Sequence, residues 1–287
     1  MPLQTPFLLS VPSAFHPMTL DPLLIVELLA LGSFTGFLAG LLGIGGSMIM
    51  VPFMVWVLGR LGVPAQWVVH AAIGTSLATT CLSSLSSVRA HHKRGAVRWP
   101  IVIALTPGIL AGAYLGSYIA THLNTKLLGL AFAFFLYFSA IQTLANLKPK
   151  AARQLPQRPG MVAAGGVIGV LSGLLGAGGG FVSVPFMTWC NVAIHNAVAT
   201  SAALGFPIAV AGTLGYIVNG WNTPGMPEWT LGFVYLPAFI VISIASVSTA
   251  PLGAKAAHSL NVAGLKRVFA FMLLALGTHM LWRSLTH

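Results

Sequence analysis

The sequence predicts an all-α polytopic membrane protein with two inverted repeats of about five helical segments each, giving 8–10 transmembrane segments and Gly-broken helices near the core. Three observations predict this fold class: the composition, a stretch that occurs twice, and the distribution of basic residues. Apolar residues make up 56% of the 287 residues and charged residues 6%, against the roughly 25% charged residues of an average soluble domain. A soluble fold cannot cover so apolar a chain with polar surface, whereas a lipid bilayer does not require one.

A Gly-rich stretch occurs twice, and its second copy marks a second half of the chain. Residues 36–54 return as residues 169–187, 133 positions later, with 12 of 19 residues identical. Two copies of one segment predict two structural halves. We therefore expect an N-terminal lead-in, a first transmembrane repeat, a cytoplasmic linker and a second transmembrane repeat, at residues 1–21, 22–147, 148–159 and 160–287.

Each half contains five apolar segments, and the second segment of each half is short. In the first half we expect segments at 22–42, 47–58, 66–88, 99–120 and 127–147. In the second half we expect them at 161–175, 181–190, 195–218, 230–254 and 262–281. The long segments approach the roughly 20 residues that a helix needs to cross the hydrocarbon core. The Gly-rich break separates the first and second segments of each half, and the third segment carries Ser and Thr.

The basic residues predict the orientation in the membrane. The loops 89–98, 148–158 and 255–267 carry 4, 4 and 3 Lys or Arg, which is 11 of the 14 in the chain. Loops rich in Lys and Arg stay in the cytoplasm. We therefore expect a multi-pass protein of the cell (inner) membrane with both termini outside. Because five is an odd number, the second half enters the membrane upside down relative to the first, as in many secondary transporters.

The repeated Gly-x-Gly-Gly interrupts a helix, and we expect it to face substrate. An interrupted helix in a membrane is tolerated only where it is packed in protein or lines a cavity. The short helix after each break begins with unbonded N–H groups and the positive end of its dipole, which suits an anion. The break residues expected to bind substrate are Gly43, Gly45, Gly46 and Ser47 in the first half, and Gly176, Gly178, Gly179 and Gly180 in the second.

The glycines also have a purely structural interpretation. They can serve tight helix packing, and we favour this for the GxxxG spacing that opens each copy. Pro52 and Pro185 follow the second glycine of each Gly-x-Gly-Gly by seven residues and are expected to kink the short helices. Ser47 offers a hydroxyl where the second copy has Gly180, so the halves need not contribute equally.

A second pairing places a His five residues before a Thr-Ser pair in both halves. The residues concerned are His70, Thr75 and Ser76 in the first half and His195, Asn196, Thr200 and Ser201 in the second. Hydroxyls and amides can donate to an oxyanion without carrying charge. Alternatively, the His caps the helix start and the Thr-Ser pair bonds back to the preceding turn. Both interpretations stay open, and the hydroxyl residues are favoured over both histidines and the asparagine as substrate contacts.

The remaining polar groups suggest no other chemistry. His91 and His92 stand beside basic residues without a nearby carboxylate, so we interpret them as loop residues and not as a metal site. Glu27 lies near the expected outer end of the first segment, where partial solvation is the simpler interpretation. Cys81 and Cys190 are interpreted as buried small hydrophobes, with a structural disulfide left open. We expect no catalytic residue, metal or cofactor, and the loop-borne charge of +11 argues against nucleic-acid binding.

The doubled Gly-Leu-Leu-Gly-x-Gly-Gly…Val-Pro-Phe-Met motif resembles the sulfite exporter TauE/SafE family of membrane transporters, as do the Gly-Thr-Ser and Ala-Thr-Ser segments and the stretch 249–255. The resemblance extends over nearly the whole chain after residue 20. It implies transport of small sulfur-containing anions such as sulfite, sulfoacetate or other organosulfonates. The positions that match the family motif are Gly43, Gly45, Gly46 and Pro52, with Gly176, Gly178, Gly179 and Pro185.

We therefore expect a secondary transporter that exports such an anion. An anion leaving an inside-negative cell gains roughly 2.3 kcal/mol per charge per 100 mV. Export then needs no coupled ion, which suits a chain with three acidic residues. The alternative is a proton- or cation-coupled uptake permease for an organic anion; an intramembrane enzyme or a channel is less favoured, because the sequence lacks the residue sets of such enzymes. The expected partners are a small anionic substrate and the lipid bilayer, and a homodimer stays open.

Overall fold

The computed structural model describes residues 21–42, 46–145, 154–259 and 262–286, and over these residues the chain is almost entirely helical. Eight of the described helices are long and apolar enough to cross a membrane, which confirms the all-α polytopic fold. The helices of the first half are α1 (Pro22–Leu42), α2 (Ser47–Arg60), α3 (Val68–His92), α4 (Trp99–His122) and α5 (Thr125–Leu144). Those of the second half are α6 (Arg158–Leu175), α7 (Gly180–Trp189), α8 (Ile194–Asn219), α9 (Leu236–Ser259) and α10 (Val262–Thr286).

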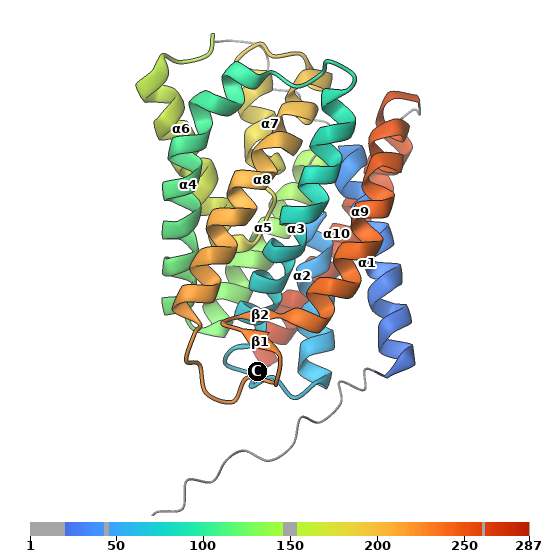
Figure 1. Ribbon diagram of the computed structural model, residues 1–287, viewed down its shortest axis with the longest axis vertical. Coiled ribbons are helices and arrows are strands. Elements are labelled where there is room, and N and C mark those ends of the chain that lie inside the picture. Colours follow the sequence, from blue (N-terminus) through green and yellow to red (C-terminus); the bar gives the residue numbers. More distant parts are fainter. Residues whose placement is uncertain (1–20, 43–45, 146–153, 260–261, 287) are drawn as a thin grey trace, which may run out of the picture.

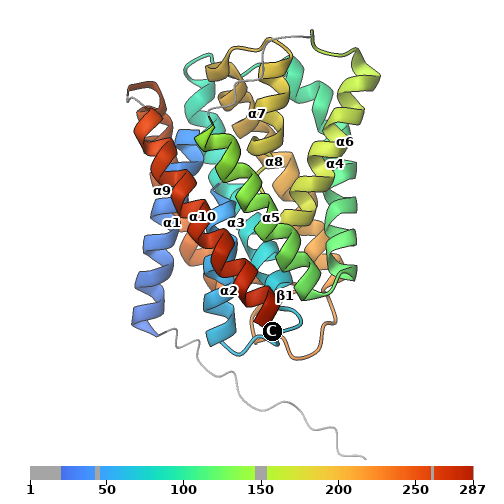
Figure 2. The same cartoon turned by 180° about the vertical axis from the view of Figure 1, so that it is seen from behind.

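The long helices form a row with a second layer behind it. Along the row, α6 packs on α4, α4 on α8, α8 on α3, α3 on α9, and α9 on α1 (Figure 1). Helices α5 and α10 pack on each other behind the row, as the view from behind shows (Figure 2). The short helices α2 and α7 pack on α3 and α8, so α3 and α8 lie at the centre of the molecule.

Packing partners in one half correspond to packing partners in the other. Helix α1 packs on α9 as α6 packs on α4, and α2 packs on α3 as α7 packs on α8. Helix α1 starts at the end of the molecule that carries the C-terminus, whereas α6 starts at the opposite end (Figure 1). Helices α1 and α6 therefore run in opposite directions.

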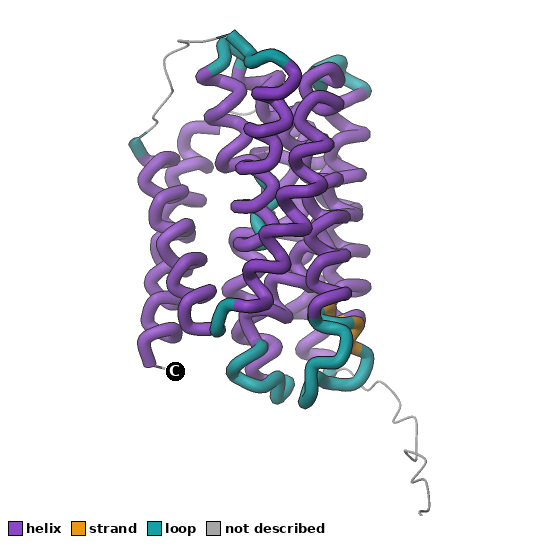
Figure 3. The backbone as a smooth tube through the Cα atoms, turned by 90° about the vertical axis from the view of Figure 1, so that its left-hand side faces the viewer, coloured by secondary structure: helices purple, strands orange, loops and turns teal. Residues whose placement is uncertain are grey.

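The two short helices turn back inside the molecule. Helices α2 and α7 have 14 and 10 residues, which corresponds to lengths of about 21 and 15 Å. Each runs from the interior towards the end at which its preceding long helix starts (Figure 1). Each pair of helices thus enters and returns on one side. As a result, the connection between α3 and α4 and the start of α6 lie at one end of the molecule, and the starts of α1 and α5 lie at the other (Figure 1). The C-terminal end of the chain lies at that second end as well, as the tube view shows (Figure 3).

Glycines bring paired helices into backbone contact. A Cβ added at Gly108, Gly112 or Gly116 of α4 would overlap the backbone of α6. In the same way, a Cβ at Gly36 or Gly40 of α1 would overlap the backbone of α9. The packing interpretation of the GxxxG spacing is therefore confirmed for the first copy. It holds for the second copy as well, because Gly169 and Gly173 of α6 meet the backbone of α4.

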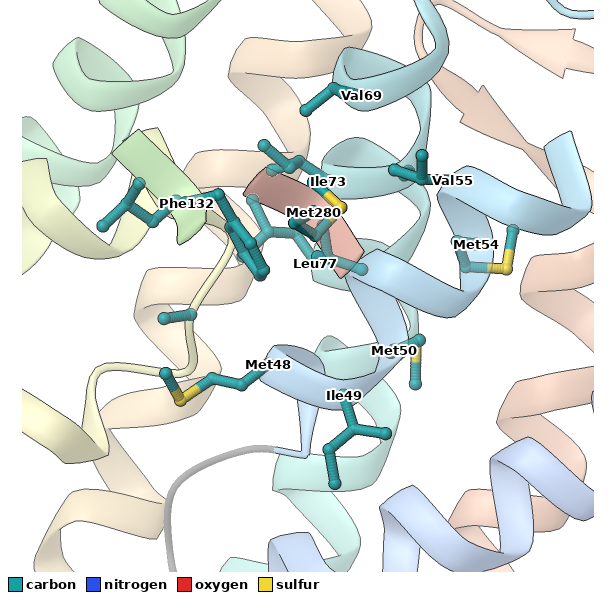
Figure 4. Packing of buried hydrophobic residues seen from close by; sticks show 14 of the residues in the cluster. Met48, Ile49, Met50, Met54, Val55, Val69, Ile73, Leu77, Phe132 and Met280 are labelled. Atoms are coloured by element: carbon teal, nitrogen blue, oxygen red, sulfur yellow. The ribbon is translucent and has the colours of Figure 1, made fainter. Parts of the chain in front are cut away.

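The main apolar core surrounds α2. Ten of the 14 residues of this helix are buried. Figure 4 shows Met48, Met50 and Met54 among side chains of neighbouring helices, including Ile73 of α3 and Phe132 of α5. The interrupted helix is thus enclosed by protein, which is the condition under which a membrane tolerates it.

Two sequence expectations are wrong in detail. Residues 230–235 form an antiparallel hairpin of β1 (Thr230–Leu231) and β2 (Val234–Tyr235), and α9 begins only at Leu236. The hairpin forms because Gly232 adopts a φ of +59° and Phe233 packs on Trp67.

The other correction concerns two histidines at a helix end, and a carboxylate near another helix end has a partner that the sequence did not predict. His91 and His92 belong to the last turn of α3, where the buried His91 Nε2 contacts the Gly40 carbonyl at 3.1 Å. Glu27 is partly exposed, which agrees with the expected partial solvation, and it also pairs with Arg60 at 3.3 Å. In both cases a partner distant in sequence decides the environment.

Candidate functional site

The two Gly breaks meet inside the molecule. Ser47 is the first residue of α2, and its Oγ accepts a hydrogen bond from the Gly178 N–H at 3.1 Å. Both residues are buried. Segments that lie 131 residues apart in sequence are therefore joined directly. The hydroxyl that distinguishes Ser47 from Gly180 thus binds the opposite break.

Glycine is required at the described ends of the breaks. Gly46 and Gly179 precede α2 and α7 with φ of +61° and +76°, and Gly176 ends α6 with a φ of +64°. A Cβ at Gly46 would overlap the Thr35 carbonyl. Such left-handed positions allow the chain to stop one helix and begin the next. Gly43 and Gly45 lie outside the described residues.

A small cavity adjoins the second break. Its volume is about 10 Å³, which is room for about one water molecule. It lies between α1, α3, α8 and the residues that precede α7, and it is lined by small and hydroxyl side chains without a charged one. The lining residues are Ala39, Ser84, Ser87, Gly178, Ser201, Ala202 and Gly205.

Ser87 has unused hydrogen-bonding capacity in this cavity. Its side chain is 2% exposed, and its Oγ has no hydrogen-bond partner in the described part of the chain. In contrast, Ser84 Oγ donates to the Cys81 carbonyl at 3.1 Å, and Ser201 Oγ accepts from Ser183 Oγ at 2.8 Å. Leaving a buried hydroxyl unpaired costs roughly 1–3 kcal/mol. A guest in the cavity that accepts a hydrogen bond would remove this cost.

The N-terminus of α7 adds positive potential next to the cavity. Gly178 lies two residues before the start of α7, and the first N–H groups of a helix have no partner within it. The dipole of the helix is positive at the same end. The arrangement therefore offers a hydroxyl donor and a partial positive charge without a formal charge, which suits a small anion.

The corresponding space at the first break is filled. When the two His-to-Ser segments are aligned, Leu77 corresponds to Ala202 and Gly212 to Ser87. Leu77 is fully buried, and a Cβ added at Gly212 would lie 2.9 Å from its Cδ1. A bulky residue in one half and a small one in the other thus make the site asymmetric.

The predicted Thr-Ser pairs separate into two roles. Thr75 Oγ1 accepts from the Tyr235 N–H and Thr200 Oγ1 accepts from the Arg98 N–H, both at 3.0 Å. Thr75 thus holds the residue that precedes α9, and Thr200 holds the residue that precedes α4. The two threonines have equivalent structural roles in the two halves. Ser201 lines the cavity. Ser76 is buried in α3, and its Oγ has no partner among the described residues.

The other predicted residues lie at helix ends or inside helices. His70 is buried, and its Nε2 contacts the Ala120 and Leu123 carbonyls at 3.1 and 3.0 Å, which ties α3 to the end of α4. His195 is exposed at the start of α8. Asn196 Nδ2 donates to the Ala96 carbonyl at 2.8 Å. Pro52 and Pro185 lie within α2 and α7 without ending them. None of these residues lines the cavity.

Sequence reasoning missed Ser84 and Ser87. A signal was present, because hydroxyl residues recur in α3 at positions 76, 80, 84 and 87. Spacings of four and three residues place them on one face of a helix. This periodicity, and not the Ser and Thr content alone, predicts a hydroxyl-lined face that includes Ser84 and Ser87.

Comparison with known proteins agrees with a membrane transporter. The sequence model of the family described as "Sulfite exporter TauE/SafE" matches residues 28–280. A "Probable membrane transporter protein" of Haemophilus influenzae is 35% identical over 253 residues, which covers 88% of this chain and 96% of the relative. A "Probable membrane transporter protein" of Methanocaldococcus jannaschii is 26% identical over 269 residues, which covers 93% and 97% of the two chains. No solved structure matches the chain.

Proposed function

The chain belongs to the sulfite exporter TauE/SafE family of membrane proteins, and from this premise we propose that it is a secondary transporter for a small sulfur-containing anion. The substrate class is sulfite, sulfoacetate or another organosulfonate, and the direction is export across the inner membrane. The two halves act as inverted repeats around one anion site at the second Gly break.

One observation carries this proposal: the buried Ser87 hydroxyl without a partner among the described residues, in a cavity next to the start of α7. A carrier must bind its substrate and also release it. Uncharged donors and a helix dipole hold an anion less tightly than a buried Arg or Lys would. The lining residues therefore favour turnover of an anion over its permanent retention.

The small size of the cavity supports a carrier that changes conformation. A sulfur oxyanion is larger than the single water molecule for which the cavity has room. Binding therefore requires α3 and α8 to move apart, since both contribute lining residues. In transporters with inverted repeats, such movement of one bundle against the other opens a central site alternately to the two sides.

The electrical driving force supports export. With the basic loops in the cytoplasm and both termini outside, an anion leaving the inside-negative cell gains roughly 2.3 kcal/mol per charge per 100 mV. Among the described residues, none of the side chains that line the cavity is a carboxylate that could carry a coupled proton.

The test is anion flux in proteoliposomes that contain the purified full-length protein. Liposomes loaded with unlabelled sulfite or sulfoacetate should exchange it for the labelled anion, and an imposed potential that is negative on the loaded side should accelerate release. Saturation and stimulation by substrate on the opposite side identify a carrier and exclude a channel. Absence of sulfite and organosulfonate flux under every potential would overturn the proposal.

A further inference from the structure

A second hollow lies on the outer side of the same helices. It has a volume of about 400 Å³, lies between α3, α4 and α8, and has a mostly apolar lining that includes Leu85, Val88, Trp99, Val102 and Phe206. Leu85 follows the cavity residue Ser84 directly, and Phe206 follows the cavity residue Gly205. The apolar groove and the anion cavity are therefore built on different faces of the same two helices.

The groove extends from one end of the molecule towards its middle. Along α4 its lining runs from Trp99 to Leu110, which corresponds to about 16 Å of helix. This is about half of a hydrocarbon core of roughly 30 Å. Helix α4 starts at the end that carries the 89–98 loop (Figure 1). In a bilayer the groove would therefore face the leaflet on that side.

Two arginines stand above the groove. Arg89 follows the lining residue Leu85 by four residues on α3, and Arg98 precedes the lining residue Val102 by four at the start of α4. Residues four apart on a helix share a face, so both cations lie about one turn beyond the apolar wall. Both side chains are exposed. Trp99 lines the groove at the start of α4, and its Nε1–H donates to His92 Nδ1 at 3.1 Å.

No carboxylate of the sequence neutralises these cations. The three acidic residues of the chain are Asp21, Glu27 and Glu228. Asp21 directly precedes α1, and Glu27 lies in the first half of that helix. Glu228 lies in the connection between α8 and β1. All three are at the end of the molecule opposite the 89–98 loop (Figure 1). The rim above the groove therefore carries an uncompensated positive charge.

We propose that this groove binds one anionic glycerophospholipid. Its phosphate lies between Arg89 and Arg98, and an acyl chain fills the groove against Val102 and Phe206. A zwitterionic lipid offers the same chain but no net charge to the rim, so the site selects for anionic lipid. The bound lipid bridges α3, α4 and α8, and through α3 and α8 it stabilises the helices that enclose the anion cavity.

The first experiment measures lipid selectivity in the purified full-length protein. Mixed micelles contain equal amounts of dioleoylphosphatidylglycerol and dioleoylphosphatidylcholine, and native mass spectrometry counts the lipids that remain bound. We expect one retained phosphatidylglycerol. Each Lys or Arg near a membrane surface adds to the attraction of anionic lipid. Arg89→Gln and Arg98→Gln should therefore each weaken phosphatidylglycerol binding roughly fivefold. Lys126→Gln is the matched control, because it removes one exposed charge at the opposite end of the molecule.

A second variant tests the apolar part of the site. Thr106 is half-buried and lines the groove, so Thr106→Trp should fill it and abolish lipid retention while circular dichroism still reports a helical fold. Equal retention of both lipids by the unaltered protein would overturn the proposal, as would equal losses in Lys126→Gln and the rim variants. Soluble glycerol phosphate that displaces the lipid at similar concentration would also overturn it, because then the charged rim alone would bind.

Discussion

Ser87 is the residue whose replacement separates substrate binding from folding. Ser87→Ala should weaken the apparent affinity for the transported anion about tenfold or more, because a hydrogen bond to a charged group contributes roughly 1.5–3 kcal/mol. The same change should leave the thermal midpoint unchanged or raise it, since it removes a buried hydroxyl without a partner in the described structure. Concentration-dependent uptake into proteoliposomes and thermal unfolding measure the two effects.

The control for this prediction is Ser248→Ala. Ser248 is exposed, and its hydroxyl donates to the Ile244 carbonyl of its own helix at 2.9 Å. Its replacement should change neither affinity nor stability. Normal affinity in Ser87→Ala would show that Ser87 does not bind the anion. A loss of stability as large as that of a core mutation would show that its hydroxyl has a partner in the folded protein.

The exchange of Leu77 and Ala202 tests the asymmetry of the site. Ala202→Leu introduces the first half's residue into the cavity, so we expect folded protein without anion flux. Leu77→Ala should keep flux while losing roughly 2–5 kcal/mol of stability, because a buried leucine is truncated. Anion flux in proteoliposomes and thermal unfolding are measured for both variants. Normal transport by a folded Ala202→Leu protein would place the substrate elsewhere.

Individual residues differ in how far the sequence can predict them. The positive φ of Gly46 and Gly179 could be predicted, because glycine adopts left-handed backbone conformations readily and recurs at both breaks. The structural roles of Thr75 and Thr200 could not, because their bonding partners lie more than 100 residues away. The filled and open spaces at Leu77 and Ala202 depend on packing between helices, for which one sequence contains no local signal.

At the level of helix pairs, glycine decides how closely α4 and α6 approach. A Cβ at Gly112 would overlap the Gly166 carbonyl, whereas a Cβ at Gly166 would come no closer than 4.0 Å to Gly108 O. Gly112→Ala should therefore cost roughly 1–3 kcal/mol, as overpacking does. Gly166→Ala should be neutral or stabilise by up to about 1 kcal/mol, because alanine is the better helix former. In thermal unfolding, the midpoint of Gly112→Ala should fall, whereas that of Gly166→Ala should stay unchanged or rise. Equal losses of stability would show that α4 crowds Gly166 as closely as α6 crowds Gly112, contrary to the structure.

Helix boundaries can be predicted from the sequence where a run of apolar residues continues without interruption. The first span, 22–42, coincides with α1. The run at 230–235 is apolar enough for a helix start, and it forms a hairpin because Gly232 adopts a positive φ and Phe233 packs on Trp67 and Tyr216. The extension of α3 to His92 likewise depends on a tertiary contact, that of His91 with Gly40. In both places tertiary structure overrides a local pattern.

At the scale of the whole molecule, the doubled stretch and the basic loops lead to one topology. The repeat predicts two halves, and the odd number of segments predicts that they run in opposite directions. The directions of α1 and α6 agree with this arrangement (Figure 1). Composition alone cannot predict this topology, because parallel and inverted repeats can have the same apolar content. The assignment of the basic end to the cytoplasm rests on the positive-inside rule.

Cysteine labelling tests that assignment directly. In a protein with Cys81 and Cys190 replaced by alanine, Leu155→Cys lies before α6 at the basic end, and Asn222→Cys lies in the exposed loop after α8. A membrane-impermeant maleimide should label Asn222→Cys in intact cells and Leu155→Cys only after permeabilisation. Ile242→Cys, at a fully buried position, should stay unlabelled in both conditions. Labelling of Leu155→Cys from outside would invert the topology. The electrical driving force would still favour export, but the anion would then enter the protein from the end that carries the hairpin and leave it at the basic end.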